Sequence, residues 1–257
     1  MSSREITTTS LKSILRFPFH GRDWMSRFVI GVALTFANFV VPIIPSLFVS
    51  GYALRVMRRA IAGEEPALPP WEDWGGLLKD GLRGLVVSLV YLLPGTFVYF
   101  SGLLLYFVVM FSFPFFEAFA KEQRGLFVLF PLLFLVSMVA LFISLSIGSL
   151  LVILGAIPLP VATAHFVAHD RVSAAFHVRE WFRLLWANKL GYVVAFVVVT
   201  GLMAIMYIAM MLTAYTLILW PLMYLLIAPF GFYLSLVSTV LFGQTYRESV
   251  MIVGREG

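Results

Sequence analysis

Hydrophobic residues run along this chain in long charge-free stretches, separated by shorter segments that mix charged and aromatic residues. No Asp, Glu, Lys or Arg occurs in residues 84–116, 125–169 or 190–246. A helix needs about 20 apolar residues to cross a bilayer, so each stretch is long enough to cross at least once. The pattern predicts an all-α, polytopic transmembrane helix bundle with amphipathic interfacial helices.

The charge-free stretches divide into several expected spans. Residues 126–164 would measure about 58 Å as one straight helix, against a hydrocarbon core of about 30 Å. We therefore expect either one long, bent span or a double span there. The other expected spans are residues 84–116, 190–213 and 217–243.

The first hydrophobic segment, residues 28–52, has a different pattern. Pro42 and Pro45 lie near its middle, and each removes a backbone hydrogen-bond donor. The segment is expected to be broken there, as a re-entrant hairpin or a span. Asn38 lies just before the break. It could mark a binding site on a discontinuous helix, but we favour a hydrogen bond to a freed carbonyl or a neighbouring helix.

Three segments between the apolar stretches are predicted to lie in the membrane interface: residues 10–27, 71–83 and 171–189. In residues 71–83 apolar and charged residues separate onto two helix faces, as in a helix lying flat on a membrane. Tryptophan is typical of the headgroup region. The predicted anchors are Trp24, Trp71, Trp74, Trp181 and Trp186.

The basic residues indicate a topology. The chain carries a formal net charge of +5, and Lys and Arg near span ends favour the cytoplasmic side. If residues 28–52 form a hairpin, every basic residue except Lys121 and Arg124 lies on one side. We favour this arrangement, with both termini cytoplasmic, over a six-crossing alternative that splits a long stretch.

The same residues indicate partners. An anionic membrane surface attracts clustered arginines. Arg55, Arg58 and Arg59 share one helix face, and with Arg179 and Arg183 they are the predicted contacts to anionic lipid headgroups. Other membrane proteins, or a second copy, are further expected partners. Nucleic acid is not expected, because no soluble basic domain with exposed aromatics is present.

Few residues suggest chemistry. His165 and His169 are four apart and share a helix face, a spacing that could hold a metal or a cofactor. We favour two interfacial histidines at a helix end, with no metal, cofactor or catalytic residue. The acidic residues 64–80 beside the arginines are expected to form a solvated interfacial loop. There is no cysteine.

One run of short motifs resembles a known family. It comprises Phe17-Pro18-Phe19, Asp23-Trp24, Gly51-Tyr52-Ala53-Leu54-Arg55, Arg58-Arg59, Gly63-Glu64-Glu65, Leu68-Pro69, Trp71-Glu72-Asp73-Trp74, Asp80-Gly81 and Tyr91-Leu92-Leu93-Pro94. A sparser match follows at residues 228–230 and 243–247. Together these resemble the domain-of-unknown-function 4013 family of prokaryotic multi-pass membrane proteins. The resemblance implies a location in the prokaryotic cell membrane, and it implies no activity and no catalytic residues.

These observations favour a non-enzymatic scaffold or accessory subunit that contacts anionic lipid and other membrane proteins. The alternative is a transporter or channel for a hydrophobic or amphiphilic solute, which would use the broken segment. A lipid-modifying membrane enzyme is the third hypothesis. Charged groups within spans usually mark coupled ion pathways, and the predicted spans have none.

Overall fold

The computed structural model describes residues 11–120, 129–215 and 220–256 of the chain. Every regular element among these residues is a helix, so the all-α prediction is confirmed. By length and composition, four helical segments among the described residues could cross a membrane: Trp74–Ala118, Leu129–His169, Lys189–Ala214 and Leu225–Arg255. The chain divides into two compact units, residues 1–87 with 160–257 and residues 88–159.

The first hydrophobic segment forms two helices, α2 (Trp24–Ala37) and α3 (Ile44–Ala62), after a short 3-10 turn, η1 (Phe17–Phe19). The chain breaks between them at the predicted prolines. Ile43 has φ 77° and ψ −57°, and the Ile44 N–H donates to the Pro42 carbonyl at 3.0 Å. This is a γ-turn of the strained type.

Residues 71–83 do not form a separate interfacial helix. Only residues 74–83 are helical, and they are the first turns of α4 (Trp74–Phe111), which continues without interruption into the predicted span. No proline lies between Trp74 and the span, so nothing ends the helix there. Its start is marked by Asp73, whose Oδ1 accepts a hydrogen bond from the Gly76 N–H at 3.0 Å.

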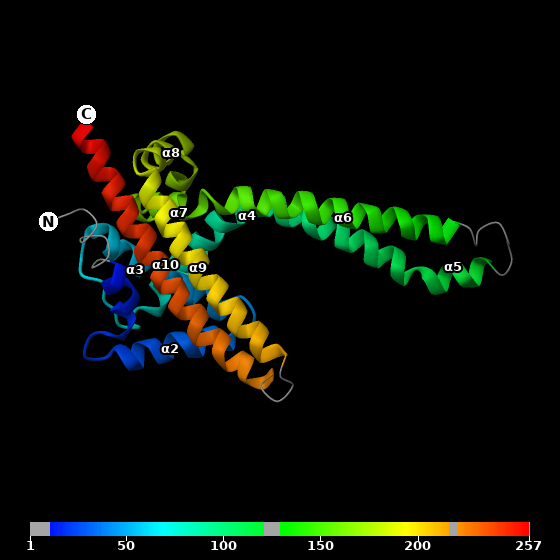
Figure 1. Ribbon diagram of the computed structural model, residues 1–257, viewed down its shortest axis with the longest axis horizontal. Coiled ribbons are helices and arrows are strands. Elements are labelled where there is room, and N and C mark those ends of the chain that lie inside the picture. The colour runs from blue at the N-terminus through cyan, green and yellow to red at the C-terminus, as the bar shows by residue number, and fades with distance from the viewer. Residues whose placement is uncertain (1–10, 121–128, 216–219, 257) are drawn as a thin grey trace. The chain divides into compact units, whose positions relative to one another are not determined.

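In the larger unit, α10 (Trp220–Glu256) contacts α2, α3, α8 (Val178–Ala187) and α9 (Lys189–Ala214). Figure 1 shows α9 and α10 side by side. The core is aromatic. Tyr52 is fully buried and stacks on Trp71 with ring centroids 3.9 Å apart, while Phe232 of α10 packs near both rings. Phe232 also covers Gly31 of α2, where a Cβ atom would lie 2.1 Å from its ring.

Glycine also allows α3 and the start of α4 to cross closely. A Cβ atom on Gly51 would lie 1.9 Å from the Leu77 carbonyl oxygen, and one on Gly81 would lie 2.0 Å from the Leu47 carbonyl oxygen. Such distances leave no room for any side chain. Because the obstacles are backbone atoms, the two helices would have to separate to accept even alanine.

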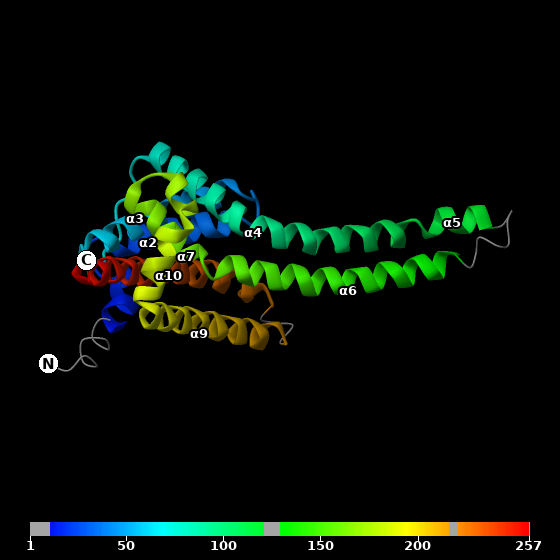
Figure 2. The ribbon, with the colours of Figure 1, turned by 90° about the horizontal axis from the view of Figure 1, so that it is seen from above.

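The smaller unit is an antiparallel helix pair, the later part of α4 with α6 (Leu129–Ala156), which lie side by side in Figures 1 and 2. Gly102 faces Ser144, Gly148 faces Tyr99 and Gly155 faces the Tyr91 carbonyl. Ser144, Gly148 and Gly155 therefore lie at the contact between the two helices. α5 (Phe113–Ala120) follows α4.

The long stretch 126–164 is two helices in its described part. α6 ends at Ala156 and α7 (Leu159–His169) begins after a two-residue turn, with Pro160 in its first turn. A first-turn proline costs no helical hydrogen bond. The predicted interfacial segment 171–189 then forms a short 3-10 turn, η3 (Val172–Phe176), and α8.

Candidate functional site, a basic cleft beside a charge network

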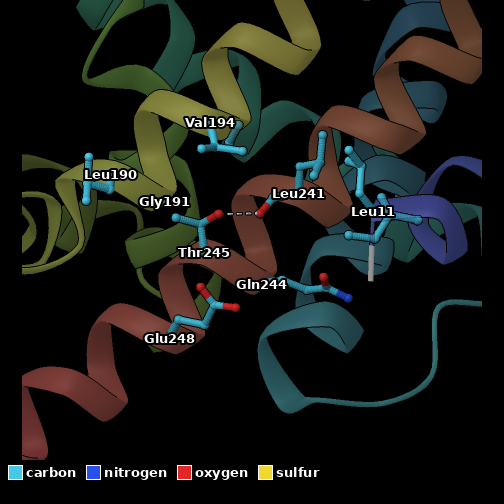
Figure 3. Close-up of a pocket in the computed structure, with 10 residues that line it drawn as sticks. Leu11, Leu190, Gly191, Val194, Leu241, Gln244, Thr245 and Glu248 are labelled. Carbon is cyan, nitrogen blue, oxygen red and sulfur yellow. Dashed lines mark hydrogen bonds between the residues drawn. The ribbon is translucent and has the colours of Figure 1, made fainter. Parts of the chain in front are cut away.

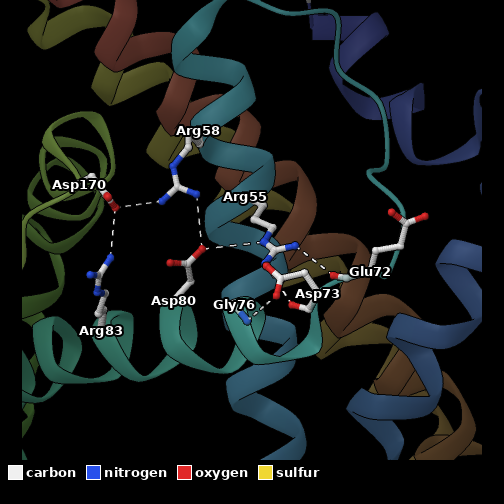
Figure 4. A network of polar contacts seen from close by, with 8 residues as sticks. All are labelled: Arg55, Arg58, Glu72, Asp73, Gly76, Asp80, Arg83 and Asp170. Carbon is white, nitrogen blue, oxygen red and sulfur yellow. Dashed lines mark hydrogen bonds and ion pairs between the residues drawn. The ribbon is translucent and has the colours of Figure 1, made fainter.

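Six charged side chains of the larger unit form one connected charge network (Figure 4). Arg55 pairs with Asp73 at 2.7 Å, and the other pairs measure 3.2–3.9 Å. Its members are Arg55, Arg58, Arg83, Asp73, Asp80 and Asp170. Three cations face three anions, so the charge network is internally neutral.

Two of the predicted headgroup contacts, Arg55 and Arg58, belong to this charge network. The third residue of that helix face, Arg59, pairs with Glu64 at 2.6 Å. Partly exposed ion pairs contribute about 0–1 kcal/mol each. All three arginines therefore already have a carboxylate partner, which weakens their attraction for a lipid phosphate. Their contact with lipid stays a prediction.

The predicted contacts on α8 are placed differently. Among the described residues, no carboxylate lies within 4 Å of Arg179 or Arg183. Both side chains line a cleft of about 700 Å³ between α7, α8 and α10. This basic cleft is also lined by His165, His169, Glu180 and Tyr246, with Val250 and Val253 of α10. The structure thus brings the predicted histidines and two predicted arginines into one site.

The floor of the basic cleft has fixed hydrogen-bond directions. His165 is 3% exposed, and its Nε2 lies 3.1 Å from Glu180 Oε2 while its Nδ1 lies 2.8 Å from the Tyr246 hydroxyl. A carboxylate only accepts, so Nε2 carries the hydrogen, and in the neutral imidazole Nδ1 then accepts from the Tyr246 hydroxyl. His169 Nδ1 donates to the His165 carbonyl at 2.9 Å, and so its Nε2 is the nitrogen left for a ligand.

Sequence reasoning found neither Tyr246 nor Glu180 as a site residue. Tyr246 is 81 positions from the histidine that it contacts. No local pattern joins residues so far apart. The described residues contain no group of three or more His, Asp or Glu side chains placed to hold a metal ion.

Beside the basic cleft, α8 has an exposed apolar stripe formed by Val178, Phe182 and Trp186. They are four residues apart, so they share one helix face, and they are 52%, 52% and 64% exposed. The rings of Phe182 and Trp186 stack with centroids 5.9 Å apart, and Lys189 Nζ lies 5.8 Å from the Trp186 ring centroid. Opposite this stripe, Trp181 and Leu184 are buried in the protein.

The prediction that all five tryptophans are membrane anchors needs correction. Trp71 and Trp181 are 8% and 5% exposed, and their ring N–H groups donate to the carbonyls of Arg27 and Ala175. Both rings pack in the protein core and cannot reach lipid. Trp74 and Trp186 are exposed and Trp24 is half-buried, so these three stay candidates.

The family model described as "Protein of unknown function (DUF4013)" matches residues 34–215. The chain belongs to this family. Comparison with curated proteins and with solved structures finds no match.

The DUF4013 match includes the charge network and the α7 and α8 walls of the basic cleft. It ends before α10, which supplies Tyr246, Val250 and Val253. The matched range includes the motifs from Gly51 to Pro94. The Phe17–Trp24 motifs and those at 228–247 lie outside it.

A second pocket of this DUF4013 chain, of about 320 Å³, lies between the N-terminal segment, α9 and α10 (Figure 3). Leu11, Val194 and Leu241 give it apolar walls, and Gln244 and Glu248 give it a polar end. Asn38 lines neither this pocket nor the basic cleft. Its Nδ2 lies 3.3–3.4 Å from two carbonyls of α2, so it caps the end of that helix. This agrees with the hydrogen bond to a carbonyl that the sequence favours.

Proposed function

We propose that this DUF4013 protein is a non-enzymatic membrane scaffold or accessory subunit that holds anionic lipid at α8. The single observation that carries the proposal is the apolar stripe of α8 beside Arg179 and Arg183. Exposed aromatic and apolar side chains suit the acyl boundary, and adjacent arginines suit anionic headgroups. Each basic side chain near such a surface contributes about 1 kcal/mol of attraction.

The wider setting belongs to the same proposal. Four described helices are able to span a membrane, and the resemblance to prokaryotic multi-pass proteins favours the cell membrane. Large apolar side chains are exposed along α4, α6 and α9. Lipid or other membrane proteins would cover them, which is why we propose both as partners.

A non-enzymatic role is supported by the geometry of the basic cleft. A hydroxyl, imidazole and carboxylate in a row can activate a nucleophile. Here the Tyr246 hydroxyl donates to His165 and the side chain is only 2% exposed. Although Tyr246 lines the basic cleft, it has little exposed surface from which to reach a bound group.

The test is lipid selectivity. Purified protein is exchanged into equal amounts of phosphatidylglycerol and phosphatidylcholine, and retained lipids are counted by native mass spectrometry. The wild type is expected to retain mainly phosphatidylglycerol, and the Arg179→Gln/Arg183→Gln variant is expected to lose this preference. Lys12→Gln/Arg22→Gln removes the same charge from another surface and is expected to keep it. Equal preference in all three proteins would refute the proposal.

A second candidate function rests on the 320 Å³ pocket, whose apolar walls and polar end suit an amphiphilic solute. It would make the protein a transporter or channel. Reconstituted vesicles would then release a fluorescent amphiphile faster than empty ones, and Val194→Trp would block the release. A Val197→Trp variant, exposed on the same helix away from the lining residues, is the matched control. Release unaffected by the protein would exclude this candidate.

A further inference from the structure

We infer that the basic cleft is a stoichiometric site for one phosphate group, from a phospholipid headgroup or free phosphate, and not merely a patch of positive charge. The inference rests on the proposed function and deepens it. A diffuse attraction needs only net charge. A site needs donors from more than one element around the same space, and the basic cleft is lined by two arginines of α8 and a histidine of α7.

The first wall is α8. Arg179 and Arg183 are one helical turn apart, so their guanidinium groups lie on the same face. Both line the basic cleft, and neither is engaged by a carboxylate among the described residues. Guanidinium groups bind phosphate oxygens through paired hydrogen bonds. By contrast, Arg55 and Arg58 are already paired, so their charge is not available in the same way.

On the floor, His169 supplies a third donor when its imidazole is protonated. His169 is exposed, and its Nδ1 is committed to the His165 carbonyl at 2.9 Å. This bond holds the imidazole in one orientation, with Nε2 as the nitrogen open to a ligand. In the protonated ring Nε2 is a donor, which adds to the two arginines.

Glu180, the one carboxylate among the described residues that line the basic cleft, is directed elsewhere. Glu180 Oε2 accepts from His165 at 3.1 Å, and Oε1 lies 3.6 Å from His177 Nδ1. Tyr246 in turn fixes His165 from the other side. The row of Tyr246, His165 and Glu180 therefore holds the acid beside histidines and leaves both guanidinium groups for an incoming anion.

The opposite wall favours a lipid source for the phosphate. Val250 and Val253 of α10 offer apolar surface next to the donors, and Val250 is 46% exposed. A free phosphate ion would gain nothing from this surface. The glycerol and acyl carbons of a phospholipid would be covered by it.

The experiment is a titration of the full-length protein in a neutral detergent, followed by calorimetry, with sodium phosphate in one arm and dihexanoylphosphatidylglycerol in the other. The lipid is expected to bind with one site per chain and inorganic phosphate at least tenfold more weakly. Arg179→Gln and Arg183→Gln are each expected to weaken lipid binding about tenfold, and His169→Ala several-fold. Tighter binding of inorganic phosphate, with the same response to the variants, would support the phosphate site and assign it to the free ion.

Two variants are matched controls. His20 Nδ1 bonds the Arg16 carbonyl four residues back, as His169 bonds His165, but on another surface. His20→Ala and Arg22→Gln are both expected to leave affinity unchanged. Circular dichroism verifies that each variant is folded.

The outcomes separate the two claims. If His169→Ala binds like the wild type while the double arginine variant loses its lipid preference, α8 still contacts anionic lipid but the site is refuted. Binding of several lipids with no response to single variants would refute it too. If the arginine variants change neither lipid preference nor titration, the proposed function also fails.

Discussion

Asp73 joins the charge network to the start of α4. Its Oδ1 accepts a hydrogen bond from the Gly76 N–H, and its Oδ2 pairs with Arg55. Both contacts hold the pKa of its carboxyl below the usual value, and the hydrogen bond from Gly76 has the larger effect. The stabilisation is therefore present above the usual carboxyl pKa of about 4 and is lost as the pH falls through the folded-state value. Asp73→Asn keeps the cap and removes the charge. Its melting temperature is expected to be below that of the wild type at pH 7, and this difference is expected to shrink as the pH is lowered below about 4.

The control for Asp73 is Asp23→Asn. Asp23 precedes α2 but makes no capping hydrogen bond with its side chain, and its ion pair with Arg27 is longer, at 3.6 Å. A smaller change at pH 7 is expected. A pH-independent difference between the wild type and Asp73→Asn would show that the charge of Asp73 contributes nothing.

Ile43 is a residue whose backbone works against its side chain. Its φ of 77° is costly for a β-branched residue, about 1–3 kcal/mol, while glycine adopts it freely. Ile43 is 64% exposed, so little packing is lost by shortening it. Ile43→Gly is expected to raise the free energy of unfolding by about 1 kcal/mol, after the entropy cost of glycine. Thermal unfolding in detergent, followed by circular dichroism, measures it.

Ile44→Gly is the matched control for Ile43, because Ile44 is similarly exposed but lies in the first turn of α3. It is expected to lower the melting temperature. A fall of the same size in both variants would mean that the turn at Ile43 is not strained.

At the scale of elements, the sequence predicted chain breaks better than it predicted which helix faces are buried. Pro42 and Pro45 act through local chemistry, so the break between α2 and α3 could be foreseen. Burial could not. In a membrane protein both the core and the lipid are apolar, so periodicity does not tell which face meets protein. This is why the sequence predicts Trp71 as an anchor although it packs on Tyr52, and why it does not connect α10 with His165.

The close contact of α4 with α6 gives a prediction at this scale. A Cβ atom on Gly155 would lie 2.1 Å from the Tyr91 carbonyl oxygen, so Gly155→Ala forces the helices apart. Overpacking of this kind costs about 1–3 kcal/mol. Gly201→Ala in α9 is the control, because no atom lies within 4 Å of its Cβ position and helix propensity favours alanine. Melting curves should fall for Gly155→Ala and stay level or rise for Gly201→Ala; equal melting temperatures would contradict the contact.

At the scale of the whole molecule, the topology remains a prediction from the basic residues, because the loop with Lys121 and Arg124 lies outside the described residues. The chain has no cysteine, so single-cysteine labelling can decide it. With a hairpin at residues 28–52, His20→Cys and Ser173→Cys lie on the cytoplasmic side and Glu117→Cys lies outside. All three positions are exposed.

An impermeant maleimide should therefore label intact cells only at position 117 and inverted vesicles only at positions 20 and 173. Leu104→Cys, exposed on an apolar helix face, is expected to react in neither preparation. If positions 20 and 117 reacted from the same side, the first segment would cross the membrane once, and the hairpin and the shared cytoplasmic position of the arginines would both be wrong.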